Sequence, residues 1–131
     1  MMRQRFVAIV LLGSGLLTDA AAQGYAPGTT AAERLQLPKY CWAQYIDKNY
    51  SGNPEYSITG CGVGMNHFCP GLIYLIRAQK VSNPPKVRAE NAGGAIAEFN
   101  YTKRAMTPDC RLRADVDAAL AKAKAIQASV K

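Results

Sequence analysis

Residues 66–108, with the sequence NHFCPGLIYLIRAQKVSNPPKVRAENAGGAIAEFNYTKRAMTP, predict two helices separated by a sharp break. On both sides of the break, apolar residues recur at steps of three and four, which is the spacing of one buried helical face. Residues 82–85 cannot continue a helix, because their two prolines remove backbone donors and clash with the preceding turn. We therefore expect a helix over about 66–80 and a second over about 86–106. The short connection predicts that the two helices pack antiparallel.

The sequence on either side of this hairpin predicts two further helices. An apolar stripe at helical spacing predicts a helix over about 37–50, which Ser, Gly, Asn and Pro end at 51–54. Another is expected over about 112–130, because acidic residues near its start and lysines toward its end complement the helix dipole. The chain thus predicts an all-α fold, a small bundle of about four helices with repeat-like hairpin packing, in a single domain over 37–131. We expect residues 23–36 to form a flexible segment before it.

The first 22 residues have the three-part layout of a secretory signal peptide. A basic start is followed by an apolar run from Phe6 to Leu17 and by three alanines that end at Ala22. The run is about a dozen residues long, whereas a membrane-spanning helix needs ~20 apolar residues. We expect cleavage after Ala22, a mature chain that starts at Gln23 and spans no membrane, and a location in the periplasm or outside the cell. Cleavage would remove two arginines and one aspartate and so lower the formal net charge from +7 to +6.

All four cysteines, Cys41, Cys61, Cys69 and Cys110, lie in the part of the chain expected to be mature. An even number of cysteines in a short exported chain predicts disulfides, here two, and four cysteines allow three pairings. The hairpin brings the end of its second helix beside the start of its first. This favours a bond between Cys69 and Cys110 and, by elimination, one between Cys41 and Cys61. The pairing of Cys41 with Cys69 and of Cys61 with Cys110 stays open as the alternative.

Residues 95–108, AIAEFNYTKRAMTP, resemble the second helix of a tetratricopeptide repeat. The pattern of that family places an Ala, an aromatic residue four positions on, a small residue three further, and a Pro after the helix. Ala95, Phe99 and Thr102 follow this spacing, with Thr in place of the usual Ala and with Pro108 one position later than the pattern. The resemblance covers 14 of the 131 residues. It implies a protein of stacked helical hairpins that binds other proteins rather than catalysing a reaction.

Aromatic side chains gather around the first expected helix and the loop that follows it. They are Tyr40, Trp42, Tyr45, Tyr50 and Tyr56. One narrow helical stripe cannot bury all of them, and aromatic residues outside a core are enriched at binding surfaces. We take the first four as the candidate binding surface for a partner protein. The alternative is that they cover the edge of the core and the disulfide.

Met65, His67 and Cys69 stand at alternate positions and would offer soft ligands to copper in an exported protein. This metal-binding role is an alternative hypothesis, since a disulfide is the more common use of Cys69. The single histidine, His67, would be the centre of an enzyme, as a general base. The chain has no Gly-x-Ser-x-Gly elbow, no haem-attachment motif and no Cys-x-x-Cys pair. We therefore expect no cofactor and no catalytic activity.

The +6 charge expected of the mature chain favours anionic partners in general. Basic residues flank the two opposite ends of the predicted hairpin, and no three of them are consecutive. They are Arg77, Lys80, Lys86 and Arg88 at one end and Lys103, Arg104, Arg111 and Arg113 at the other. We expect at most weak contact with anionic surfaces and no nucleic-acid partner. The predicted role is non-catalytic binding of another exported or envelope protein.

Overall fold

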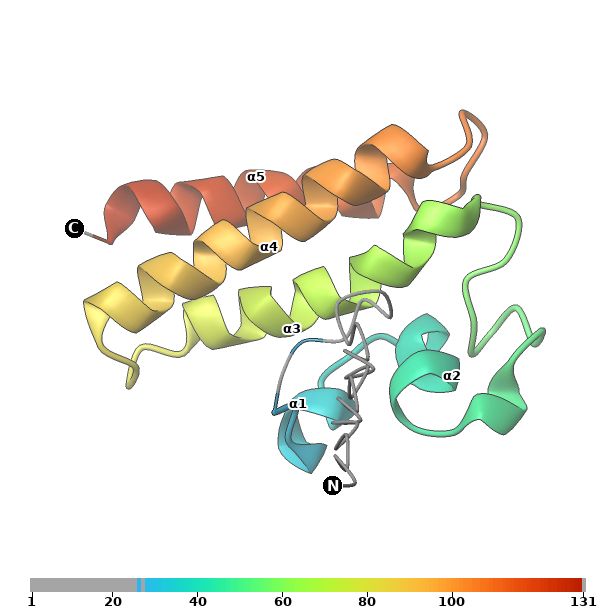
Figure 1. Ribbon diagram of the computed structural model, residues 1–131, viewed down its shortest axis with the longest axis horizontal. Helices are drawn as coiled ribbons and strands as arrows, with labels where there is room; N and C mark the ends of the chain where they lie inside the picture. The colour runs from blue at the N-terminus through green and yellow to red at the C-terminus, as the bar shows by residue number, and fades with distance from the viewer. Residues whose placement is uncertain (1–25, 27, 131) are drawn as a thin grey trace, which may run out of the picture.

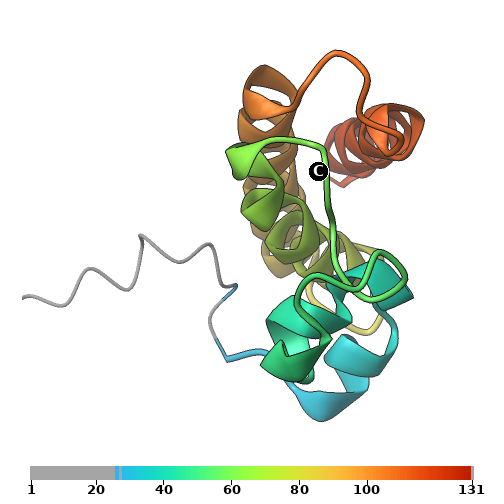
Figure 2. The same cartoon turned by 90° about the vertical axis from the view of Figure 1, so that its right-hand side faces the viewer.

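The computed structural model describes residue 26 and residues 28–130, so the predicted signal peptide and the predicted start at Gln23 lie outside the described residues. In the described part of the chain every regular element is helical (Figure 1). The helices are α1 (Ala31–Leu35), α2 (Trp42–Tyr45), α3 (Phe68–Gln79), α4 (Pro85–Ala105) and α5 (Arg113–Ser129). The three long helices pack on one another, and the two short helices lie on the α3 side of the bundle (Figures 1 and 2). The predicted all-α bundle with two disulfides is confirmed.

Helices α3 and α4 form the predicted antiparallel hairpin. Pro85 occupies the first turn of α4, where its missing N–H costs no intrahelical hydrogen bond. The two helices meet closely at Gly71, where a Cβ atom would lie 2.5 Å from the ring of Phe99. The rings of Phe68 and Phe99 meet edge to face, with centroids 5.7 Å apart. Residues of the second helix that follow the repeat-like spacing are fully buried, as Phe99 and Thr102 show.

Helix α3 separates two hydrophobic cores, because it presents apolar residues on two faces. Phe68 and Leu75 belong to the first core, which α4, α5 and the segment before α3 complete. Cys69 and Ile73, one turn apart on another face, belong to the second core. The second core also contains Ala26, Leu37, Cys41 and Tyr45. These four residues of the N-terminal segment are thus packed against one face of α3.

The single helix predicted over 37–50 is wrong, because three short helical pieces replace it. These are the 3-10 turns Lys39–Cys41 and Lys48–Tyr50 on either side of α2. The backbone N–H of Ala43 donates to the carbonyl of Tyr56 at 2.9 Å, which ties the segment to the following loop. Asp47 is extended and its carboxylate accepts from the backbone of Asn49 at 2.9 Å, which stops α2 and starts the next turn.

A helix also forms inside 23–36, where the sequence predicted a flexible segment. The side chains of Thr30 and Glu33 each accept a hydrogen bond from the backbone of the other residue, forming a capping box that starts α1. The five residues of α1 are too few to be stable as an isolated helix. Arg77 on α3 supplies the tertiary contact, because its guanidinium donates two hydrogen bonds to the Glu33 carboxylate at 2.7 and 3.1 Å.

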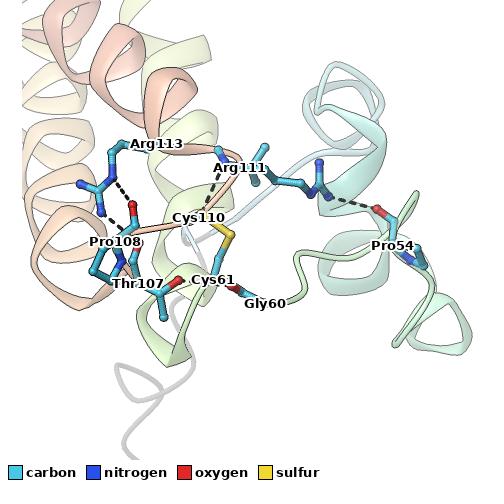
Figure 3. The surroundings of a disulfide bond; sticks show 9 residues. Pro54, Gly60, Cys61, Thr107, Pro108, Cys110, Arg111 and Arg113 are labelled. Carbon is cyan, nitrogen blue, oxygen red and sulfur yellow. Dashed lines mark hydrogen bonds between the residues drawn. A yellow bond between two sulfur atoms is a disulfide. The ribbon is translucent and has the colours of Figure 1, made fainter.

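The favoured disulfide pairing is wrong, and the alternative pairing is the one observed. Cys41 is bonded to Cys69 and Cys61 to Cys110, with Cα atoms 5.7 and 4.6 Å apart. A bond between Cys41 and Cys61 would require the loop after the first helix to fold back along that helix. Instead residues 60–61 run beside the α4–α5 connection, where Thr107 donates its backbone N–H to the Cys61 carbonyl at 3.0 Å and its hydroxyl to the Gly60 carbonyl at 3.2 Å (Figure 3).

Candidate functional site

The four aromatic residues predicted as a binding surface do not lie together. Tyr45 is buried in the second core, and its hydroxyl accepts a hydrogen bond from the backbone of Ala26 at 3.3 Å. Tyr40 stacks on Phe68 with ring centroids 6.1 Å apart, and burial raises its pKa to about 12. These two side chains therefore serve mainly to pack the short helices onto α3.

Trp42 and Tyr50 instead form a separate aromatic stack with Tyr56. The ring centroids of Tyr50 and Tyr56 are 4.6 Å apart, and those of Trp42 and Tyr56 are 5.6 Å apart. All three rings are half-buried and lie outside both hydrophobic cores. Lys39 covers the Tyr56 ring at 5.7 Å and pairs with Glu55 at 3.0 Å, which raises the pKa of its ammonium group. The stack thus braces the loop after α2.

Next to Tyr45, two large apolar side chains that the sequence analysis did not single out are exposed. Leu35, at the end of α1, is 71% exposed, and Ile46, directly after α2, is 43% exposed. Together with Ala31, Arg34 and Tyr45 they line a hollow of about 240 Å³. We call these five residues the α1–α2 surface. Their proximity follows from the fold of the short helices, so no spacing in the sequence indicates it.

Two contacts hold the α1–α2 surface in place. The Cys41–Cys69 disulfide fixes the start of α2 to α3, and the Glu33–Arg77 pair fixes α1 to the same helix. The hydrogen bonds from Arg77, stronger than the opposing effect of burial, lower the pKa of Glu33 from 4.5 to about 2. Glu33 is therefore a carboxylate at neutral pH, and α1 is docked by a charged, bidentate contact.

The structure does not bring Met65, His67 and Cys69 together as a metal site. The sulfur of Cys69 is bonded to Cys41, and Met65 is buried in the first core. Within the described residues there is no group of three or more His, Cys, Asp or Glu side chains that could hold a metal ion. The arrangement therefore supplies no coordination geometry that would support the copper hypothesis.

His67 is held by a carboxylate that the sequence analysis did not assign to it. Its Nδ1 lies 2.6 Å from Oε2 of Glu98 on α4, and its ring centroid lies 4.0 Å from that of Tyr101. The three side chains join the segment before α3 to α4.

The basic residues at the α4–α5 end of the hairpin are largely engaged with the protein itself. Arg113 donates to the carbonyls of Thr107 and Pro108 at 2.9 and 3.2 Å, and Arg111 donates to the carbonyl of Pro54 at 3.1 Å (Figure 3). Lys103 pairs with Asp117 at 2.7 Å. These side chains brace the loops around the Cys61–Cys110 disulfide rather than form an open cationic patch.

At the opposite end, a larger groove runs between α1 and the α3–α4 turn. Its volume is about 760 Å³. The Glu33–Arg77 pair forms part of its wall, next to the aliphatic side chains of Ile76 and Val87. We call it the α1–α3–α4 groove. Like the α1–α2 surface, it exists only because α1 docks on α3.

Comparison of the chain with models of protein families, with curated proteins and with solved structures found no match. Across residues 28–130, none of the helices is both long enough and apolar enough to cross a membrane. Any functional conclusion therefore rests on the chemistry of the surfaces described above.

Proposed function

We propose that this protein is an exported, non-catalytic binding module that docks a partner protein on its α1–α2 surface. The observation that carries the proposal is the exposure of Leu35 and Ile46 in a hollow that Tyr45 also lines. Clustered exposed apolar side chains mark interaction sites, whereas scattered ones do not. The tetratricopeptide-like stretch of α4 supports the same class of function, since the resemblance implies a protein that binds other proteins.

The arrangement suits a protein partner for a physical reason. Complete burial of a fully exposed Leu or Ile side chain contributes about 1.5–3 kcal/mol, and an apolar side chain of the partner in the hollow would cover the exposed parts of Leu35 and Ile46, which gives a fraction of that. The disulfide and the Glu33–Arg77 pair hold the two short helices before the partner arrives, so little conformational entropy is lost on binding. The Arg34 guanidinium at the rim adds a hydrogen-bond donor that favours an acidic or carbonyl group beside the apolar contact.

The proposed function also includes export of the chain from the cytoplasm. The signal-peptide pattern of residues 1–22 directs the chain to an oxidising compartment, where its two disulfides form and persist. The mature chain would start at Gln23 and act in the periplasm or outside the cell, on another exported or envelope protein.

The test compares two double variants in affinity capture from the exported fraction of the producing cells. In Leu35→Ser/Ile46→Ser the proposed surface loses its apolar contacts. In the control, Val63→Ser/Val81→Ser, two side chains that are 92% and 83% exposed elsewhere are changed in the same way. We expect the first variant to lose a partner that the wild type and the control retain, while both stay folded because exposed positions contribute little to stability. Equal capture by both variants would overturn the proposal.

A further inference from the structure

The α1–α3–α4 groove has the size of a ligand site. Its volume of about 760 Å³ lies within the roughly 300–1,000 Å³ that is usual for such sites. It lies across α1 from the proposed docking surface: Leu35 and Ile46 line that surface, and neither lines the groove. Its function can therefore be considered independently of the proposed function.

Four carboxamide side chains line this groove, each held by one hydrogen bond to the backbone. They are Gln36, Gln79, Asn83 and Asn91, whose NH₂ groups donate to carbonyls of Ala32, Leu75, Arg77 and Val87 at 2.8–3.1 Å. One N–H of each amide is used, which favours one orientation of the side chain. Within the described part of the chain, their carbonyl oxygens have no hydrogen-bond partner, and each NH₂ group retains a second donor.

Two of the three charged side chains that line the groove pair with each other. Glu33 and Arg77 neutralise each other through their bidentate contact. Lys80, at the end of α3, lines the groove and has no ion pair in the part of the chain that the structure describes. Ile76 and Val87 supply the apolar area between these polar groups. The groove thus combines oriented amides, an aliphatic patch and one available cation.

We infer that the α1–α3–α4 groove binds an extended, acidic peptide segment of a protein. In an extended segment the N–H and the C=O of one residue point to the same side, so that residue forms two parallel hydrogen bonds with a carboxamide. An aliphatic side chain of the segment packs on Ile76 and Val87, and a carboxylate pairs with Lys80. A sugar would use the same amides, but the groove lining contains no aromatic ring on which a sugar face could stack.

The probe is a phage-displayed library of random peptides, selected on the protein purified after export. Enriched peptides are then synthesised, and their affinities are measured by calorimetry. Gln79→Ala/Asn91→Ala removes two of the oriented amides and keeps good helix formers at both positions. Lys80→Glu reverses the available charge. The matched controls are Lys86→Glu, a nearby charge reversal outside the groove lining, and Leu35→Ser, a change on the α1–α2 surface.

We expect the enriched peptides to be acidic and to contain an aliphatic residue. Each hydrogen bond lost in the amide variant should weaken their binding by about fivefold, and Lys80→Glu should weaken it at least as much. Both controls should bind like the wild type, which also separates this site from the proposed docking surface. The inference is overturned if no peptide is enriched, if the enriched peptides are not acidic, or if the groove variants bind them as tightly as the controls do.

Discussion

The Arg77 guanidinium donates hydrogen bonds to both oxygens of the Glu33 carboxylate, with N···O distances of 2.7 and 3.1 Å, and so joins two residues that are 44 positions apart. This contact docks α1 on α3, although no residue of α1 is buried. Both the α1–α2 surface and the α1–α3–α4 groove include α1 residues, so this ion pair contributes to both binding surfaces.

Glu33→Gln should therefore loosen α1 and lower the free energy of unfolding by about 1–2 kcal/mol at neutral pH, because a bidentate charged contact is replaced by a weaker neutral one. The pKa of Glu33 is lowered in the folded state, so its stabilisation is fully present above pH 4.5 and is lost as the pH falls toward 2. Urea unfolding of both proteins between neutral pH and pH 2 would test this.

Glu55→Gln is the matched control, because Glu55 makes an exposed pair with Lys39 at a similar distance. Its effect should be smaller than that of Glu33→Gln, because exposed pairs contribute little to stability. A wild-type advantage over Glu33→Gln that does not shrink at acid pH would contradict the role assigned to the ion pair.

The disulfide pairing predicts a specific set of linked peptides. Cyanogen bromide cleaves after Met65 and Met106, and trypsin cleaves after Lys39, Lys48, Arg77 and Arg111, so each cysteine falls in its own fragment. Under non-reducing conditions, fragment 40–48 should be linked to 66–77, and fragment 49–65 to 107–111. A link between 40–48 and 49–65 would restore the pairing that the hairpin geometry first favoured.

The long helices were predictable from sequence because their periodic patterns extend over many residues, so local errors average out. The first helix was not, because its segment makes contacts with distant residues, such as the hydrogen bond from Ala43 to the Tyr56 carbonyl. The candidate sites were not predictable from the sequence either. The partners Glu33 and Arg77, like His67 and Glu98, meet only in the folded chain, and no local spacing encodes such contacts.

The favoured prediction of the disulfide pairing was wrong for a related reason. Cys110 does lie near the start of α3, where it shares the first core with Phe68 and also with Cys61. The loop at Gly60 and Gly62 adopts positive φ angles of 69° and 91° and turns Cys61 toward Cys110. Cys69 instead faces the second core, where it is bonded to Cys41.

Glycine positions give a prediction about packing. A Cβ atom at Gly64 would collide with the Cβ of Ala105 on α4, whereas one at Gly93 would meet only the flexible end of Gln127, at 3.3 Å. Gly64→Ala should destabilise the protein by about 1–3 kcal/mol through overpacking. Gly93→Ala, inside α4, should instead stabilise it by about 0.5–1 kcal/mol through helix propensity. Thermal unfolding of the two variants should shift in opposite directions, and shifts in the same direction would refute the assigned packing.

The raised pKa of Tyr40 makes the free energy of unfolding depend on pH in the alkaline range. Burial against Phe68, with a smaller contribution from the charge of Asp115, raises the pKa of Tyr40 from 10.0 to about 12 in the folded protein. Because the folded state holds the phenol proton more tightly than the unfolded state, this group contributes its full stability below pH 10 and loses it as the pH rises through 12.

Tyr40→Phe keeps the stacked ring but has no proton to lose. Its free energy of unfolding should therefore fall less than that of the wild type between pH 9 and pH 12, measured by urea unfolding at each pH, because the remaining tyrosines and lysines are common to both proteins. Parallel pH profiles for the two proteins would show that the Tyr40 hydroxyl is open to solvent and that the 40–45 segment does not pack on α3 as described.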